Sequence, residues 1–132
     1  TNNLERCDTA GFEKIGTGMT ESSGVFTFPS TGKWLIRFQA SYYSNSQGDR
    51  LWGKAEVHTT TDDGTYVQGS QSIVNCSQNN DSCSSPTSFL FDVTNVSTHK
   101  VKLRVRANST WYVSGSTDVN DTHAEFMKVG DT

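Results

Sequence analysis

Large apolar side chains recur at every second position after a Pro/Gly turn near residue 30. Beyond Pro29 and Gly32, the alternating apolar positions are Trp34, Ile36, Phe38, Ala40 and Tyr42. A period of two is the spacing of a β-strand that buries one face. The pattern therefore predicts a long central strand over Lys33–Tyr43, preceded by a short strand over Val25–Phe28.

Further segments alternate in the same way and are separated by turn residues. The other predicted strands are Leu51–Thr59, Tyr66–Val74, Thr87–Val93, Lys100–Ala107, Trp111–Val113 and His123–Val129. We also expect a short edge segment at Gly11–Met19, around Phe12 and Ile15, and a long polar loop at Asn75–Ser85. No window combines a 3.6-residue period with helix caps. Roughly eight to ten short strands predict an all-β, antiparallel two-sheet sandwich or jelly roll.

The chain length of 132 residues fits one domain. We expect residues 1–10, which are polar and irregular, to form a flexible N-terminal arm, and residues 11–132 to form a single domain. No apolar run approaches the ~20 residues of a membrane span. No cationic, apolar leader is visible, so the sequence gives no sign of a secretory signal.

Composition narrows the classes of partner. Hydrophobic residues make up 33% of the chain, and the mean hydropathy is -0.58. The core must therefore be small and rely on aromatic side chains. The net charge of -3 and the pI near 5.5 argue against a general affinity for nucleic acid.

The chain has three cysteines, so they cannot all pair in disulfides within one chain. Cys76 and Cys83 flank a polar loop and could close a small disulfide, or they could remain two free thiols. Cys7 has no evident partner. The cysteines and histidines lack zinc-ligand spacing, and Asp62-Asp63-Gly64 is more typical of a turn than of a calcium loop. No metal or cofactor is expected.

The segment Gly24–Phe38 reads Gly-x-Phe-Thr-x-Pro-x-x-Gly-x-aromatic-x-Ile-x-Phe. It resembles the signature of the complement globular-head and tumour-necrosis-factor superfamily. Val101–Val105 is similar to the penultimate strand of that family, and Thr122–Val129 to its terminal strand. The resemblance covers roughly residues 11 to 129. It implies a ten-stranded jelly roll that assembles as a homotrimer and acts as a non-enzymatic ligand- or receptor-binding head. In phages and other viruses, similar folds cap fibres or decorate capsids.

Residues on the second face of two predicted strands are candidates for a trimer interface. Large side chains stand there beside polar ones, and a three-fold assembly would bury them. The candidates are Leu35, Arg37, Tyr43, Met127 and Val129. The alternative is that a second sheet of the same chain covers this face.

Candidate ligand-binding residues form a basic stripe and an aromatic pair. The stripe is Lys100, Lys102, Arg104 and Arg106, which alternate with apolar residues; the pair is Trp111 and Tyr112. The stripe could bind phosphate, a sulfated or acidic glycan or lipopolysaccharide. The interpretation we favour is a solvated strand face, paired with acidic residues of a neighbouring strand or subunit, that resists aggregation. Exposed aromatic rings could stack on sugars, whereas buried ones would need no further role.

No catalytic residues are identified. His58, His99 and His123 are isolated, and no nucleophile elbow, phosphate loop or HExxH motif occurs. We predict a non-enzymatic, homotrimeric virion-surface protein of the fibre-head, knob or capsid-decoration type, whose partners are its own copies and other virion proteins or a host glycan or receptor. The alternative is a secreted cellular ligand or lectin of the complement-head type. Five Asn-x-Ser/Thr sites, at Asn75, Asn80, Asn95, Asn108 and Asn120, would then invite glycans.

Overall fold

A computed structural model describes residues 4, 14–44, 52–76, 81–107, 111–116 and 118–132. This part of the chain contains nine β-strands and no helix, so the predicted all-β class is confirmed. The strands are β1 (Thr20–Ser22), β2 (Val25–Thr27), β3 (Gly32–Ser44), β4 (Trp52–Thr60), β5 (Val67–Asn75), β6 (Asp81–Val93), β7 (Lys100–Ala107), β8 (Trp111–Ser114) and β9 (His123–Gly130).

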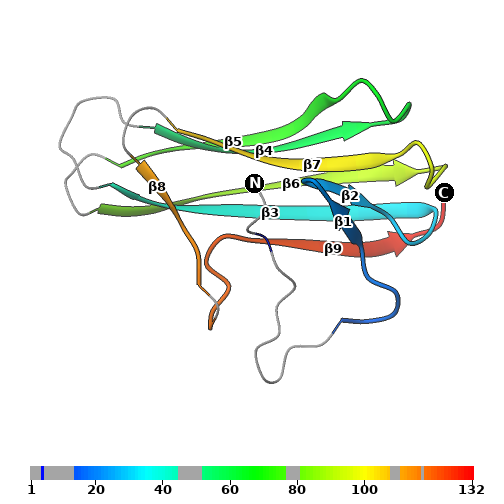
Figure 1. Cartoon of the computed structure of the whole chain (residues 1–132), viewed down its shortest axis with the longest axis horizontal. Helices are drawn as coiled ribbons and strands as arrows, with labels where there is room; N and C mark the ends of the chain where they lie inside the picture. The colour runs from blue at the N-terminus through cyan, green and yellow to red at the C-terminus, as the bar shows by residue number, and fades with distance from the viewer. Residues whose placement is uncertain (1–3, 5–13, 45–51, 77–80, 108–110, 117) are drawn as a thin grey trace.

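The strands form two antiparallel sheets, and the longer strands run along the long axis of the molecule (Figure 1). The first, here called sheet A, has five strands in the order β1-β2-β7-β4-β5. The second, sheet B, has four strands: β3 lies beside β6 on one side and beside both β8 and β9 on the other. The two sheets share one hydrophobic core, to which β3, β4, β6 and β7 all contribute.

Strand β3 organises sheet B. It pairs with β6 along its whole length, from Gly32 opposite Val93 to Ser44 opposite Asp81. Its other edge is divided, because β9 pairs with residues 33–39 and β8 with residues 41–44. The predicted buried face of this strand is confirmed: Trp34, Ile36, Phe38, Ala40 and Tyr42 are all buried.

The core is small and aromatic, as the composition indicated. Phe28 lies 5.4 Å from the ring of Trp34 and 5.8 Å from that of Phe91. At the other end of the core, the rings of Tyr42 and Trp111 are 5.5 Å apart. Tilted aromatic pairs at these distances contribute about 0.5–1.5 kcal/mol beyond the burial of their area.

The predicted polar loop Asn75–Ser85 is wrong over half of its length, because β6 begins at Asp81. Serine has no strong strand preference, so these residues are held by long-range pairing with β3 rather than by local propensity. Pro86 is accommodated because β6 is an edge strand that pairs on one side only. Side-chain hydroxyls then join its inner face to β5: Ser85 donates to Ser72, and Thr87 donates to Ser70, both at 3.0 Å.

The predicted edge segment Gly11–Met19 is also wrong over its described residues. Residues 14–19 form no strand, and Ile15 is fully exposed. The first strand instead begins at Thr20 and forms a hairpin with β2. Apart from Leu4, the predicted arm at residues 1–10 lies outside the described residues, as does Cys7.

Candidate functional site

The face of sheet B that points away from the core carries a row of exposed apolar side chains. Leu35 on β3 is paired with Leu90 on β6 and with Met127 on β9, so the three side chains lie on one line across the sheet. Leu90 is 57% exposed and Met127 is 52% exposed. Val129 is equally exposed and lies where the pairing of β9 with β3 shifts register. We call Leu35, Leu90, Met127 and Val129 the apolar row.

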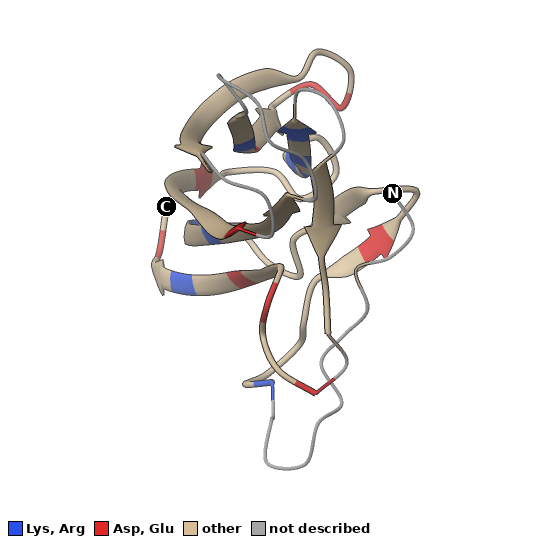
Figure 2. Ribbon diagram, turned by 90° about the vertical axis from the view of Figure 1, so that its left-hand side faces the viewer, with Lys and Arg blue, Asp and Glu red and all other residues tan. Residues whose placement is uncertain are grey.

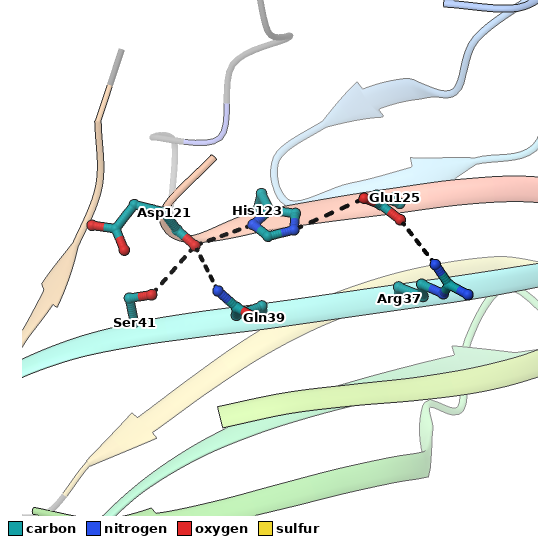
Figure 3. Close-up of polar contacts among 6 residues, drawn as sticks. All are labelled: Arg37, Gln39, Ser41, Asp121, His123 and Glu125. Carbon is teal, nitrogen blue, oxygen red and sulfur yellow. Dashed lines mark hydrogen bonds and ion pairs between the residues drawn. The ribbon is translucent and has the colours of Figure 1, made fainter. Parts of the chain in front are cut away.

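A charged row, formed by Arg37, Glu125 and His123, lies beside the apolar row on the same face of sheet B (Figure 3). Arg37 Nη1 is 3.6 Å from Glu125 Oε2, and His123 Nε2 is 4.0 Å from Glu125 Oε1. The Arg37 and Glu125 side chains are about half exposed. An exposed pair of this kind contributes only about 0–1 kcal/mol to stability. The pair therefore contributes little to the stability of the fold.

A polar cluster follows the charged row, at the point where the pairing of β3 passes from β9 to β8. The backbone carbonyl of Asp121 accepts hydrogen bonds from the Ser41 hydroxyl at 3.3 Å and from Gln39 Nε2 at 3.4 Å (Figure 3). The Asp121 carboxylate accepts a 2.5 Å bond from the Ser114 hydroxyl. That bond is the main reason why the pKa of Asp121 lies below its usual value. The cluster is a structural brace between strands.

An open depression of about 370 Å³ lies over the charged row. It is lined by Arg37, Phe38, Gln39, Pro86, Thr87, Ser88, His123 and Glu125. Among the described residues of this lining, Glu125 is the one carboxylate. Within the described residues, no three His, Cys, Asp or Glu side chains come together as a metal-binding group.

The basic stripe lies on the opposite side of the molecule, on the outer face of sheet A. Register places β7 beside β4, with Lys102 opposite His58, Arg104 opposite Glu56 and Arg106 opposite Lys54. Figure 2 shows blue Lys and Arg bands gathered on neighbouring strands in the upper half of the view. Sequence reasoning did not place Lys54 in this group, because alternation within a strand does not tell which strands are neighbours.

A buried carboxylate stands within this basic face. Glu56 is 1% exposed, although it lies on the outer side of β4. Its carboxylate lies 2.9 Å from His58 Nε2 and 3.7 Å from Arg106 Nη1. Long basic side chains can cover such a group with their aliphatic stems. Glu56 therefore holds two of its neighbours in place from beneath.

Two aromatic rings carry ammonium groups on the same face. Lys102 Nζ lies 3.8 Å from the ring centre of Tyr66, and Lys54 Nζ lies 5.1 Å from that of Trp52. Such cation–π contacts contribute about 0.5–1 kcal/mol at exposed sites. They limit the number of orientations that the two lysines adopt.

The structure separates the predicted site residues. Of the candidate interface residues, Leu35, Arg37, Met127 and Val129 lie near one another on β3 and β9 of sheet B, whereas Tyr43 lies near the far end of β3, where the strand pairs with β8. The basic stripe lies on sheet A. Trp111, predicted as a ligand-binding candidate, is 8% exposed and packs on Tyr42, so its ring is a core group and not a surface one. Its neighbour Tyr112 is 58% exposed and is paired with Tyr43.

Leu90 is the member of the apolar row that the sequence analysis missed. Its signal was present, since it alternates with the core residues Phe89 and Phe91 and must therefore face the other way.

The Asp62 carboxylate accepts hydrogen bonds from the backbone of Gly64 and Thr65, at 2.9 and 2.8 Å, which is the behaviour of a turn-forming aspartate.

The structure joins Cys76 and Cys83 in a disulfide, with their Cα atoms 6.2 Å apart. The sequence left open a disulfide or two free thiols, and the structure contains the disulfide. The bridge links the end of β5 to the early part of β6, and so connects an edge of sheet A to an edge of sheet B.

No protein-family model matches the chain, and no curated protein compared with it is similar in sequence. The resemblance to the complement-head and tumour-necrosis-factor superfamily therefore stays a prediction. Within the described residues, no helix has the length and apolar character needed to cross a membrane.

Proposed function

We propose that the protein is a non-enzymatic, homotrimeric jelly-roll module with a structural and receptor- or glycan-binding role at a virion surface, as a fibre head, knob or capsid decoration. The single observation that carries the proposal is the apolar row. Leu90, Met127 and Val129 are each at least half exposed, on a sheet whose other face already supplies the core. Contiguous apolar groups exposed on a folded domain are typical of an interaction surface.

Chain topology supports the jelly-roll part of the proposal. Between β2 and β8, the chain passes from one sheet to the other at five connections, and only β4 and β5 follow each other within a sheet. Repeated crossing between two antiparallel sheets is the property that separates jelly rolls from simple meanders. The long strand β3 in sheet B is the one that carries the family-like motif in the sequence.

The charged row supports self-association in a defined orientation. Arg37 and Glu125 lie beside the apolar row, and both are about half exposed, so they can form ion pairs with other copies. When one edge of this face binds a different edge of the same face on the next copy, each copy is rotated relative to the one before. The copies form a closed ring when these rotations add up to a full turn. A ring of three would remove the apolar row from water, whereas the charges beside it would set the register.

Light scattering during size-exclusion chromatography tests the assembly. The unmodified protein should elute with three times its chain mass of 14.5 kDa. Leu90→Glu and Met127→Glu should each produce monomers, because a carboxylate would be buried unpaired at the interface. The matched control is Ile73→Glu, which changes a side chain of similar exposure, 51%, on β5 of sheet A and should leave the trimer intact. A folded, monomeric unmodified protein at micromolar concentration would refute the proposal.

The virion setting is tested separately from the trimer. Antibodies to the purified protein should label intact particles, and the protein should co-sediment with particles through a density gradient. Its absence from purified particles would contradict the setting while leaving the trimeric module in place.

The disulfide also fits a second candidate function, a secreted cellular ligand or lectin of the complement-head type. Disulfides form and persist in oxidising compartments and are rare in reducing ones, and Cys76 and Cys83 are bonded here. Mass spectrometry of the protein from its native source decides between the two candidates. A processed leader and glycans on Asn95 or Asn120 would favour the secreted ligand, and bare asparagines on a protein recovered from particles would favour the virion.

A further inference from the structure

The outer face of sheet A concentrates positive charge in a chain whose net charge is -3. Strands β4 and β7 carry five of the 11 Lys and Arg residues and a single carboxylate. The five are Lys54, Lys100, Lys102, Arg104 and Arg106. The neighbouring strand β5 carries no charged residue. The three strands together are therefore basic, and the acidic residue that acts on their edge is Asp63, which, after burial, raises the pKa of Tyr66.

The one carboxylate does not neutralise the face. Glu56 is buried and is engaged with His58 and Arg106. Among the described residues, none of the ion pairs includes Lys54, Lys102 or Arg104. Three cations therefore stand on adjacent strands without an acidic partner in the described part of the chain, and the cation–π contacts of Lys54 and Lys102 keep two of them on the face.

The spacing of these cations suits a linear polyanion. Lys102, Arg104 and Arg106 alternate along β7, and alternate residues of a strand are about 6.6–6.8 Å apart. The row therefore extends for roughly 13 Å, and Lys54 lies beside its end at the ~4.8 Å spacing of neighbouring strands. A small anion would reach one or two of these groups, whereas a chain with repeated anionic groups would reach all of them.

The same face is a poor surface for nucleic acid. Base recognition in single strands relies on open aromatic faces, and here Lys102 and Lys54 lie over the rings of Tyr66 and Trp52.

We propose that the outer face of β4 and β7 binds an acidic polysaccharide through its carboxylate or sulfate groups, with Lys54, Lys102 and Arg104 as the main contacts. This inference specifies the ligand class of the binding role proposed above and rests on it. The two can fail separately, because self-association is assigned to sheet B and the ligand to sheet A.

Binding is measured by surface plasmon resonance on immobilised heparin, polygalacturonate and neutral dextran, with a mixed-sequence DNA oligomer as a fourth surface. Heparin carries both sulfate and carboxylate groups, whereas polygalacturonate carries carboxylate groups alone, so binding to heparin only would assign recognition to sulfate. The unmodified protein should bind one or both acidic polymers and not dextran. Raising NaCl from about 50 to 300 mM should weaken binding at least tenfold, because salt screens exposed charges.

The decisive variant is Lys54→Gln/Arg104→Gln, which leaves the Glu56 pairs intact. It should weaken binding by about tenfold or more, because two charge contacts with the polymer are lost. The matched control, Lys14→Gln/Lys33→Gln, removes the same charge from exposed positions elsewhere and should change binding less than about twofold. Light scattering on both variants checks that assembly is unchanged.

Three results would overturn the inference: no binding to either acidic polymer at low salt, equal losses in the decisive and control variants, or tighter binding to DNA than to the polysaccharides. A trimer that binds no acidic polymer would sink this inference alone. A monomer that binds one would sink the trimer proposal alone.

Discussion

The ring of Tyr42 lies against Gly53, and its hydroxyl donates a 2.5 Å hydrogen bond to the backbone carbonyl of Lys54. A Cβ at Gly53 would lie 2.8 Å from the ring, closer than side chains normally approach. Tyr42 is on β3 and Gly53 on β4, so this contact fastens sheet B to sheet A. It also explains why a glycine interrupts the apolar alternation of β4.

Gly53→Ala should destabilise the protein by about 1–3 kcal/mol, because the added methyl group overpacks the core. Urea denaturation followed by tryptophan fluorescence measures the change. The control is Gly130→Ala, where an added Cβ meets nothing within 4 Å. That variant should stay within about 0.5 kcal/mol of the unmodified protein. Equal stability of all three proteins would contradict the contact.

Tyr42→Phe should change the response to alkali. Burial, followed by the nearby Glu56, raises the pKa of Tyr42 from 10.0 to about 12. The folded protein therefore keeps this proton to a higher pH than the unfolded chain does. The contribution of Tyr42 to the free energy of unfolding is fully present below pH 10 and is lost as the pH rises toward 12. The variant should lose about 1 kcal/mol at neutral pH with its hydrogen bond, and should lack this alkaline fall. Denaturation curves from pH 7 to 12 check both effects; parallel curves would exclude the role.

Reduction of the Cys76–Cys83 disulfide should lower stability. The two residues are seven positions apart, and closing so small a ring is worth about 2–3 kcal/mol in the chain-entropy description. Thermal unfolding with and without a reductant measures the difference. A Cys76→Ala/Cys83→Ala variant should melt at the same temperature in both buffers, which controls for effects of the reductant elsewhere. An unchanged melt of fully reduced protein would count against the prediction.

Asp121→Asn should lower the stability of the fold at neutral pH and make that stability less sensitive to acid. Since the Ser114 hydrogen bond lowers the pKa of Asp121, its contribution is present above the unfolded pKa, about 3.9, and is lost as pH falls through the lower folded value. The variant should be less stable by about 1–2 kcal/mol at pH 7, and the difference should shrink on acidification. The control Asp118→Asn changes an exposed residue of the same connection. A difference that is constant with pH would argue against an ionised Asp121.

Much of the fold could be predicted because apolar alternation is a local property. The buried face of β3 follows directly from residues two apart, and so does the outward direction of Leu35 and Met127. The same rule, applied to the segment that contains Phe89 and Phe91, would have identified Leu90. Residues that face out of a sheet are thus readable from sequence whenever the buried face is strongly apolar.

What could not be predicted depends on partners distant in the chain. Asp81–Ser85 is a strand because β3 is long enough to pair with it, and its own serines carry no such signal. The juxtaposition of Lys54 and Glu56 with the basic stripe required the order of strands in sheet A. Trp111 differs again, because a short apolar run next to a polar loop does not tell which of two neighbouring aromatic rings enters the core.

Thr122 has a consequence for how this protein can vary. Its hydroxyl accepts the Ser41 backbone N–H at 3.0 Å and donates to the Ser114 carbonyl at 2.5 Å, at the position where β9 gives way to β8 beside β3. The Thr122 side chain thus takes the place of a backbone hydrogen bond between strands, and it bridges the interval between β8 and β9. Because that junction is sealed locally, residues between Ser114 and Asp121 could be lengthened or exchanged without shifting any pairing in the sheet. New peptide segments can therefore be inserted in this connection, by evolution or by design, while the strand pairing of the sheet stays the same.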